Sequence, residues 1–193
     1  MTTSAPIAKM TYAEYLAFEQ KSETKHEFLN GEVFAMAGGT IEHGALAASL
    51  ARVIGNALRA RPCRPLSSDV RVRVKATDLA TYPDLTIVCG KVETDRDDPD
   101  GVLDPSLIIE VLSDSTEAYD RGAKAAHYRR IPSLREYVLV SQDAPLIEVH
   151  RRNERGNWEL VSEARKGERA ELASCGDAFT IEVDEVYRNP LTS

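Results

Sequence analysis

Two short apolar stretches, residues 85–89 and 107–112, restrict the fold of this chain more than any other feature. Both have the length of a strand, and both are apolar at nearly every position instead of at alternate positions. Such continuous runs are typical of central strands that are covered on both faces of a sheet. We therefore expect a mixed α/β (α+β) fold in which helices flank a central sheet.

The rest of the chain supplies elements that could surround such a sheet. The dipeptide Asn30-Gly31 predicts a type I′ hairpin, because both residues tolerate positive φ angles. Strand 70–75 alternates valine with arginine or lysine, which predicts one buried and one wet face. Three helices are expected: one that starts at about residue 11, one over about residues 42–58 and one over about residues 120–131. The further expected strands are 26–29, 32–36, 137–140, 146–150 and 158–161.

The composition is that of a globular protein. The 193 residues are 42% hydrophobic and 28% charged, which argues against a disordered chain. No repeat or linker divides them, so we expect a single domain over residues 1–193, with residues 1–9 as a flexible tail. No stretch approaches the ~18 consecutive apolar residues of a transmembrane helix, so no membrane partner is expected.

The net charge of −7 limits the ways in which this chain could meet nucleic acid. Proteins that bind duplex DNA passively through its phosphates are usually basic, because counterion release drives that binding. This chain would need bound metal cations or a local basic surface to offset its own carboxylates. Five residues could form such a surface: Arg71, Arg73, Arg129, Arg130 and Arg135.

The cysteines and the amino terminus predict a reducing compartment. Cys63, Cys89 and Cys175 are odd in number and widely spaced, which argues against a disulfide framework and against a zinc knuckle. Residues 1–9 lack the apolar stretch of a signal peptide, which argues against secretion. The expected location is the cytoplasm.

Several catalytic motifs are absent. The sequence contains no HExxH, CxxC or GxSxG motif, and no GxGxxG follows an expected strand. Residues 39–45 have the glycine spacing of a phosphate loop but lack the lysine that grips a β/γ-phosphate. These absences argue against nucleotide-dependent and serine-hydrolase functions.

Carboxylates inside the apolar stretches carry the strongest chemical signal. Glu110 interrupts the run 107–112, and Asp84 stands before the run 85–89, directly after Pro83. Burying an unpaired carboxylate costs several kcal/mol, so Glu110 is expected to have a partner. Two carboxylates from neighbouring strands can converge on one divalent cation, and oxygen ligands favour Mg²⁺ or Mn²⁺.

Lys124 is the third candidate residue. It lies on the expected helix after the Glu110 strand, with Asp120 four residues before it and Tyr128 four residues after it. A lysine beside two metal-binding carboxylates can orient water or stabilise charge on a phosphoryl oxygen. Hydrolysis of a phosphodiester requires these groups.

The ordered set of these motifs resembles the Uma-type endonucleases of the PD-(D/E)XK restriction-endonuclease-like superfamily. The resemblance covers about residues 11–152 and includes these residues: Tyr82-Pro83-Asp84-Leu85, Glu110-Val111-Leu112-Ser113, Asp120, Lys124, Tyr128, the segments 27–32 and 132–137, and His43. It implies a restriction-endonuclease-like fold, with a central mixed sheet flanked by helices. It also implies a Mg²⁺-dependent (or Mn²⁺-dependent) endonuclease acting on nucleic acid, with DNA as the expected partner.

The resemblance assigns roles to five residues. Asp84 and Glu110 would hold the metal, and Lys124 would activate water. Glu27 would be an accessory carboxylate near the metal or water, and His43 would contact phosphate or water. The superfamily's lysine stands two residues after the acid, where this chain has Leu112, so Lys124 on the following helix is the candidate for a displaced lysine.

Other interpretations stay open at this point. The fold could serve as a catalytically silent binding or interaction module, or the metal site could hydrolyse a small phosphoester. Glu110 could instead be a structural carboxylate paired with a buried arginine, and Lys124 could be an ordinary solvated residue. If the protein cuts both strands of DNA, two active sites in a homodimer are the simplest arrangement.

Overall fold

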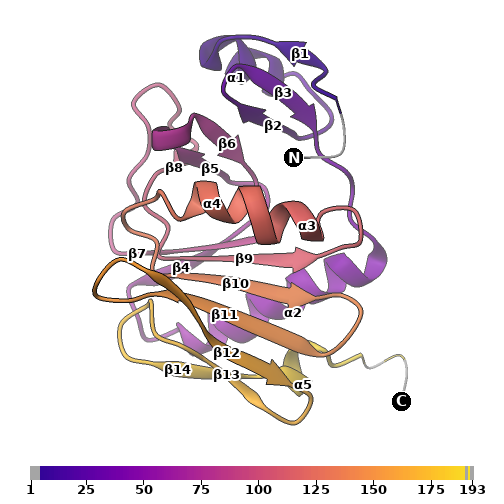
Figure 1. Ribbon diagram of the computed structural model, residues 1–193, viewed down its shortest axis with the longest axis vertical. Coiled ribbons are helices and arrows are strands. Elements are labelled where there is room, and N and C mark those ends of the chain that lie inside the picture. The colour runs from indigo at the N-terminus through magenta and orange to yellow at the C-terminus, as the bar shows by residue number, and fades with distance from the viewer. Residues whose placement is uncertain (1–4, 190, 192–193) are drawn as a thin grey trace.

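Two six-stranded sheets and a two-stranded hairpin form most of the structure, a computed structural model that describes residues 5–189 and 191 (Figure 1). The smaller sheet lies at the amino-terminal end of the molecule, and the larger sheet lies below it in this view. The hairpin comprises β13 (Arg169–Leu172) and β14 (Phe179–Glu182) and lies at the far end.

The larger sheet contains both predicted apolar strands at its centre. In it β9 pairs in parallel with β10, and the other neighbours are antiparallel. The sheet is therefore mixed, as predicted. Its strand order is β12 (Trp158–Arg165), β11 (Leu146–Arg152), β10 (Glu136–Ser141), β9 (Leu107–Leu112), β7 (Leu85–Cys89) and β4 (Cys63–Ser67).

The smaller sheet is built on the predicted hairpin. Asn30 and Gly31 have φ angles of 49° and 85°, which allows the tight turn between β2 and β3. The strand order is β1 (Ala8–Lys9), β3 (Glu32–Ala35), β2 (His26–Leu29), β6 (Leu79–Thr81), β5 (Arg71–Val74) and β8 (Gly101–Val102). Residues 1–4 of the predicted tail lie outside the described residues, whereas Ala8–Lys9 pair with β3.

Helices cover both faces of the larger sheet. The long helix α2 (Ile41–Ala57) packs on one face, and the segment α3 (Glu117–Tyr119), η2 (Asp120–Lys124) and α4 (Ala125–Tyr128) crosses the other face, below the smaller sheet (Figure 1). The remaining helical segments are α1 (Tyr12–Glu19), η1 (Lys75–Thr77) and α5 (Val183–Val186). Among the described residues, no helix has both the length and the hydropathy of a membrane span.

The alternation of side chains along β9 divides the core into two layers. Ile109 and its neighbours at even spacing, Leu107 and Val111, pack with α2 in one buried cluster. Ile108 and Leu112 face the other way and pack with Tyr128 in a second cluster. Glu110 shares this second face, so its carboxylate points toward the η2–α4 segment.

The first helix forms where the sequence predicts it. The Thr11 side chain accepts a hydrogen bond from the Glu14 backbone N–H, and the Glu14 carboxylate accepts one from the Thr11 N–H (2.7 Å). This reciprocal pair is a capping box, which satisfies N–H groups that a helix start leaves free.

The expected wet face of strand 70–75 is wrong for its two arginines, whereas Lys75 is exposed. Arg73 is buried and stacks on the ring of Tyr12, 3.9 Å from its centroid, while it pairs with Asp78. Arg71 is half-buried and pairs with Asp98 (2.7 Å). The two arginines lie between β5 and α1. This burial is possible because their aliphatic side-chain carbons pack against neighbouring residues while carboxylates neutralise the guanidinium groups.

The expectation that the cysteines form no disulfide framework is wrong for one pair. Cys63 and Cys89 form a disulfide between β4 and β7, where they are direct partners across the two strands. Their 26-residue separation gave no sign of this contact, because the register of two strands decides it.

Candidate active site

A cavity of about 220 Å³ opens between the two sheets. Its walls come from β2, from the segment 35–40 before α2, from the start of β7, from β9 and from the α3–η2 segment. All five predicted site residues line it: Glu27, His43, Asp84, Glu110 and Lys124. The fold thus brings together residues separated by nearly 100 positions in the sequence.

Asp84 and Glu110 hold each other through backbone amides. The Asp84 N–H donates to Glu110 Oε2 (3.3 Å), and the Val111 N–H donates to Asp84 Oδ2 (2.8 Å). Asp84 ends the irregular segment before β7, and Glu110 lies within β9, which pairs with β7. The reciprocal bonds fix both carboxylates at the edge of the cavity.

Lys124 reaches the same point from the helical segment. Its Nζ lies 2.8 Å from Glu110 Oε1 and donates to Asp120 Oδ1 at 3.0 Å. All three side chains are buried, with exposures of 3–7%. Lys124 is therefore not a solvated helix residue, and Glu110 pairs with this lysine instead of with an arginine.

The predicted helix 120–131 begins as a π-helical turn, Asp120–Lys124, and its α-helical part ends at Tyr128. Such wide turns are often found at functional sites. The hydroxyl of Tyr137 in β10 donates to the backbone carbonyl of Asp120 (3.0 Å) and gives this carbonyl a partner. One turn later, the Tyr128 hydroxyl donates to Glu110 Oε1 (2.8 Å). The start of the turn and the end of α4 are thus each tied to the sheet by a tyrosine hydroxyl.

The electrostatics of Glu110 are dominated by burial. Desolvation raises the pKa of Glu110 to about 8, and the nearby negative charges of Asp120 and Asp84 add to this effect, while Lys124 opposes it. Burial alone would lower the pKa of Lys124, but the surrounding carboxylates, Glu110 foremost, hold it well above its ordinary value. Lys124 is thus a cation that lies between the carboxyl groups of Glu110 and Asp120.

We expect the metal-free protein to lose stability as the pH rises from about 5 to 8. The folded state keeps the Glu110 proton up to about pH 8, whereas the unfolded state releases it near 4.5, so the folded state binds more protons in this interval. One such group contributes a slope of at most about 1.4 kcal/mol per pH unit. Glu110→Gln cannot titrate and should flatten the curve, as measured by urea unfolding in chelator at several pH values.

Glu117→Gln is the matched control for this experiment, since Glu117 is an exposed carboxylate on the neighbouring α3. It should leave the pH dependence of the wild type unchanged. Parallel curves for the wild type and Glu110→Gln would contradict the raised pKa.

His43 orients Asp84 from the first turn of α2. Its Nε2 donates to Asp84 Oδ1 (2.8 Å), and this hydrogen bond raises the pKa of His43. Thr40 caps the helix by accepting from the His43 N–H (3.1 Å). Gly39 lies so close that an added Cβ would be 2.8 Å from the imidazole ring, so a side chain here would displace His43.

Glu27 lines the same cavity from β2 and is buried. Its Oε1 accepts a hydrogen bond from the hydroxyl of Tyr119 in α3. The sequence pattern did not indicate Tyr119, and Asp120 and Tyr128 entered the family resemblance as motif residues without a role in the site. The spacing of Asp120, Lys124 and Tyr128 at intervals of four could have assigned all three to the site, since such residues share one helix face.

The donor atoms at the edge of the cavity fit a hard divalent cation. Asp84 and Glu110 provide carboxylate oxygens, and oxygen donors suit Mg²⁺ or Mn²⁺ better than Zn²⁺. The raised pKa of Glu110 points the same way, because a cation beside this group would offset the cost of its buried charge.

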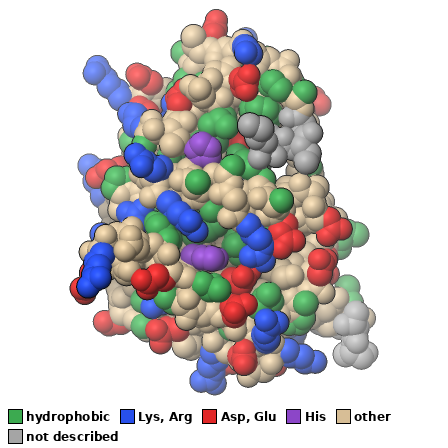
Figure 2. Space-filling model, viewed as in Figure 1, with side chains coloured by type: hydrophobic (Ala, Val, Ile, Leu, Met, Phe, Trp, Pro, Cys, Tyr) green, Lys and Arg blue, Asp and Glu red, His purple; other side chains and the backbone are tan. Residues whose placement is uncertain are grey.

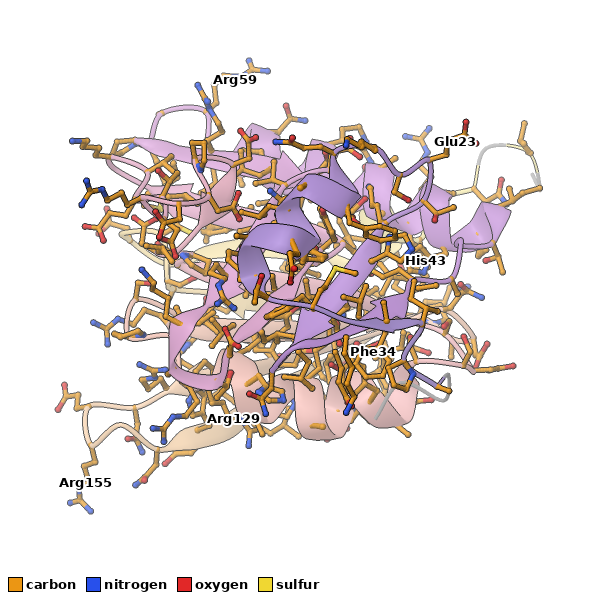
Figure 3. All side chains as sticks on the ribbon, turned by 90° about the horizontal axis from the view of Figure 1, so that it is seen from above. Glu23, Phe34, His43, Arg59, Arg129 and Arg155 are labelled. Carbon is orange, nitrogen blue, oxygen red and sulfur yellow. A yellow bond between two sulfur atoms is a disulfide. The ribbon has the colours of Figure 1, made fainter. Side chains whose placement is uncertain are left out.

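The five arginines do not form one phosphate-facing surface. Arg71 and Arg73 are already paired with carboxylates, and only Arg129, Arg130 and Arg135 are exposed. In Figure 3, Arg129 lies well away from His43, which marks the cavity. Figure 2 shows Lys and Arg side chains mixed with Asp and Glu on one face of the molecule.

The fold matches that of one solved protein structure over almost its whole length. The structure aligns with the crystal structure of a putative nuclease belonging to DUF820 from Anabaena variabilis ATCC 29413, with a TM-score of 0.71 and 14% sequence identity over 94% of this chain and 98% of that chain. This likeness confirms the predicted restriction-endonuclease-like class of fold.

Sequence comparison identifies the family. The Uma2 family, described as putative restriction endonuclease, matches residues 12–184, so this chain belongs to that family. Two relatives come from Synechocystis sp. (strain ATCC 27184 / PCC 6803 / Kazusa). Uncharacterized protein slr1290 is 36% identical over 96% of this chain and 95% of its own length, and Uncharacterized protein sll1609 is 32% identical over 89% and 96%.

Proposed function

We propose that this protein is a Mg²⁺-dependent endonuclease that hydrolyses phosphodiester bonds in DNA. The observation that carries the proposal is the convergence of Asp84, Glu110 and Lys124 at one edge of a cavity. The Asp84 N–H lies 3.3 Å from the Glu110 carboxylate, and Lys124 Nζ lies 2.8 Å from it. Membership of a nuclease family supports it.

Asp84 and Glu110 are the residues that would hold the cation, either Mg²⁺ or Mn²⁺. When bound, the cation supplies Lewis-acid polarisation of the phosphate and makes water more acidic. Asp84 presents a carboxylate whose orientation is fixed by Val111 and His43. Glu110 presents one that is fixed by Asp84 and Tyr128. Preorganised ligands of this kind need little rearrangement during the reaction.

Lys124 would orient the attacking water and stabilise the charge that develops on the phosphoryl oxygens. Asp120 holds its ammonium group in place through the ion pair one helical turn away. Glu27 would act as an accessory carboxylate for water or metal, and its position is fixed by Tyr119. His43 is a positioning residue, because its observed contact is with Asp84.

A nucleic acid substrate fits the proposed cation. The net charge of −7 opposes binding of a polyanion, and a divalent cation at the cavity would offset part of this repulsion. A homodimer would supply two active sites for cutting both strands, and a cytoplasmic location would give access to DNA. The single domain over residues 1–193 stays a prediction.

The direct test is incubation of the purified chain with plasmid, linear and single-stranded DNA. Products should appear with Mg²⁺ or Mn²⁺ and should disappear in chelator. Cleavage of a small phosphoester without cleavage of DNA would favour a small-molecule hydrolase. Binding of DNA without cleavage under either metal would favour the catalytically silent module.

His43→Ala is expected to slow DNA cleavage by about 10–100-fold, the usual effect of removing a group that orients a metal ligand. The expected cause is freer movement of the Asp84 carboxylate, which loses its 2.8 Å hydrogen bond. Cleavage rates should be compared with those of His150→Ala, which removes a half-buried histidine in β11. Equal rates for the two variants would contradict a positioning role for His43.

A further inference from the structure

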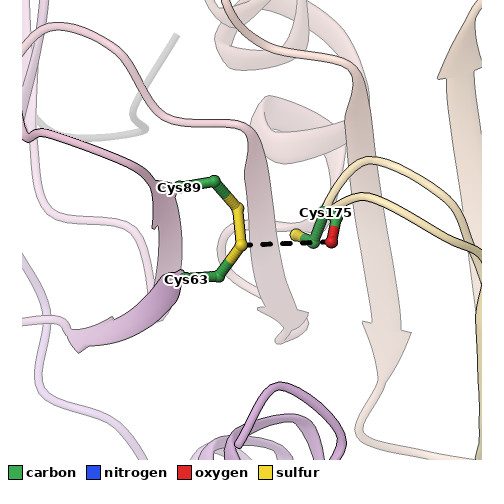
Figure 4. Close-up of side chains that lie close together, drawn as sticks. All are labelled: Cys63, Cys89 and Cys175. Carbon is green, nitrogen blue, oxygen red and sulfur yellow. Dashed lines mark hydrogen bonds between the residues drawn. A yellow bond between two sulfur atoms is a disulfide. The ribbon is translucent and has the colours of Figure 1, made fainter. Parts of the chain in front are cut away.

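Three cysteine sulfur atoms meet at the end of the larger sheet, away from the candidate active site (Figure 4). The Sγ atoms of Cys63, Cys89 and Cys175 all lie within 4.8 Å of one another. Within residues 5–189 and 191, this is the one group of three potential metal-ligating side chains that come so close. Neither the proposed nuclease function nor the fold accounts for it.

Two of the cysteines are fixed by strand pairing. Cys63 begins β4 and Cys89 ends β7, and their Cα atoms lie 4.0 Å apart as direct partners in the antiparallel ladder. Asp84 stands at the opposite end of β7. Five residues of extended strand span about 17 Å, so the cysteine cluster is separate from the carboxylates of the active site.

The third cysteine lies on a loop that is tied down on both sides. Before Cys175, the backbone N–H groups of Ala173 and Ser174 donate to the buried Glu136 carboxylate at 3.0–3.1 Å. At Cys175 itself, Arg61 Nη1 donates to the backbone carbonyl (3.0 Å). The loop between β13 and β14 therefore presents this sulfur in a defined place.

We propose that these three cysteines form a thiolate site that binds Zn²⁺ when the Cys63–Cys89 disulfide is reduced. Zinc binds thiolates at about 2.3 Å, which places the sulfurs of a tetrahedral site about 3.8 Å apart. The observed sulfurs lie within 4.8 Å, so small side-chain rotations suffice. Three protein ligands leave a fourth position for water.

The disulfide and the metal site exclude each other. A phosphine reductant breaks the S–S bond with one water molecule: the oxygen passes to phosphorus, which is oxidised, and each sulfur gains a proton. Zinc then displaces the protons of the three thiols as the thiolates bind. Re-formation of the disulfide by a disulfide oxidant removes two of the three ligands and releases the metal.

Thiol–disulfide exchange within the cluster is the less favoured use of Cys175. The residue is 3% exposed, and burial raises the pKa of its thiol, an effect that the hydrogen bond with Ser174 and the charge of Arg61 only partly oppose. A protonated thiol is a poor nucleophile toward the neighbouring disulfide. A bound cation, in contrast, stabilises the thiolate directly.

Cobalt(II) is the probe for the test, because thiolate ligands give it a charge-transfer absorption that carboxylates do not. The full chain, reduced with a phosphine and freed of excess reductant, should develop this band up to one Co²⁺ per chain, and Zn²⁺ should abolish it. The band should be absent from the oxidised protein and lost in Cys175→Ser. It should persist in Asp84→Asn, which alters only the other site.

Absence of the band from the reduced wild type, or an equal band in Cys175→Ser, would overturn the proposal. If Cys175→Ser fails to fold, alkylation of the reduced wild type gives a second answer. Zinc should protect all three cysteines from iodoacetamide, as measured by mass spectrometry. Equal alkylation with and without zinc would also overturn the proposal.

Discussion

Replacement of Asp84 or Glu110 by alanine is expected to lower the rate of DNA cleavage by about 10³-fold or more, equivalent to about 4 kcal/mol of transition-state stabilisation. Each residue provides an oxygen ligand for the proposed cation. The two residues also fix each other's position: the Asp84 N–H donates to the Glu110 carboxylate, and the Asp84 carboxylate accepts from the Val111 N–H. The rate should therefore fall in either variant, measured on plasmid DNA with Mg²⁺ or Mn²⁺.

Glu117→Gln again provides the control, because it removes an exposed carboxylate close to the cavity without touching Asp84 or Glu110. Its rate should match that of the wild type. Circular dichroism should establish that all variants are folded. Wild-type rates in both alanine variants would refute the assignment of the metal-binding residues.

Lys124→Met is expected to destabilise the metal-free protein by about 3–5 kcal/mol, because it leaves buried carboxylates without their cation. Lys124 contacts both Glu110 (2.8 Å) and Asp120 (3.0 Å), and methionine keeps the length of the side chain without its charge. For a chain of this size the melting temperature should fall by about 6–20 °C. Urea unfolding in chelator above pH 8, where Glu110 is ionised, measures the free energy directly.

The double variant Lys124→Met with Glu110→Gln tests the cause. Neutralising Glu110 should restore part of the stability that Lys124→Met removes, since fewer buried charges then lack a partner. Arg130→Met, on the exposed surface after α4, is the control for removing a positive charge. A loss no larger in Lys124→Met than in this control would show that the buried ion pair contributes little.

The sequence was most informative where local chemistry decides the structure. Asn30 and Gly31 define the hairpin because few other residues accept positive φ angles. Glu110 indicated the candidate site because a carboxylate inside an apolar strand needs a partner. The same argument could not name that partner, since the sequence leaves open which helix covers which face of the sheet.

What the sequence did not predict depends on contacts between distant segments. The burial of Arg73 follows from the packing of α1, which supplies the ring of Tyr12. The disulfide follows from the register of β4 against β7. The π-helical turn at Asp120–Lys124 follows from its anchoring to β10 through Tyr137. None of these partners is near in the chain, so no local pattern reveals them.

The place of Glu110 within β9 has a consequence for folding as well as for chemistry. Sliding β9 by one residue against its neighbours would turn Glu110 toward α2, among Leu50 and Ile54, and would turn Ile109 into the cavity. A buried carboxylate without a cation would make this misaligned sheet costly. An all-apolar strand would lack that penalty. The residue proposed to hold the cation would therefore also favour the correct alignment of the central strands while the chain folds.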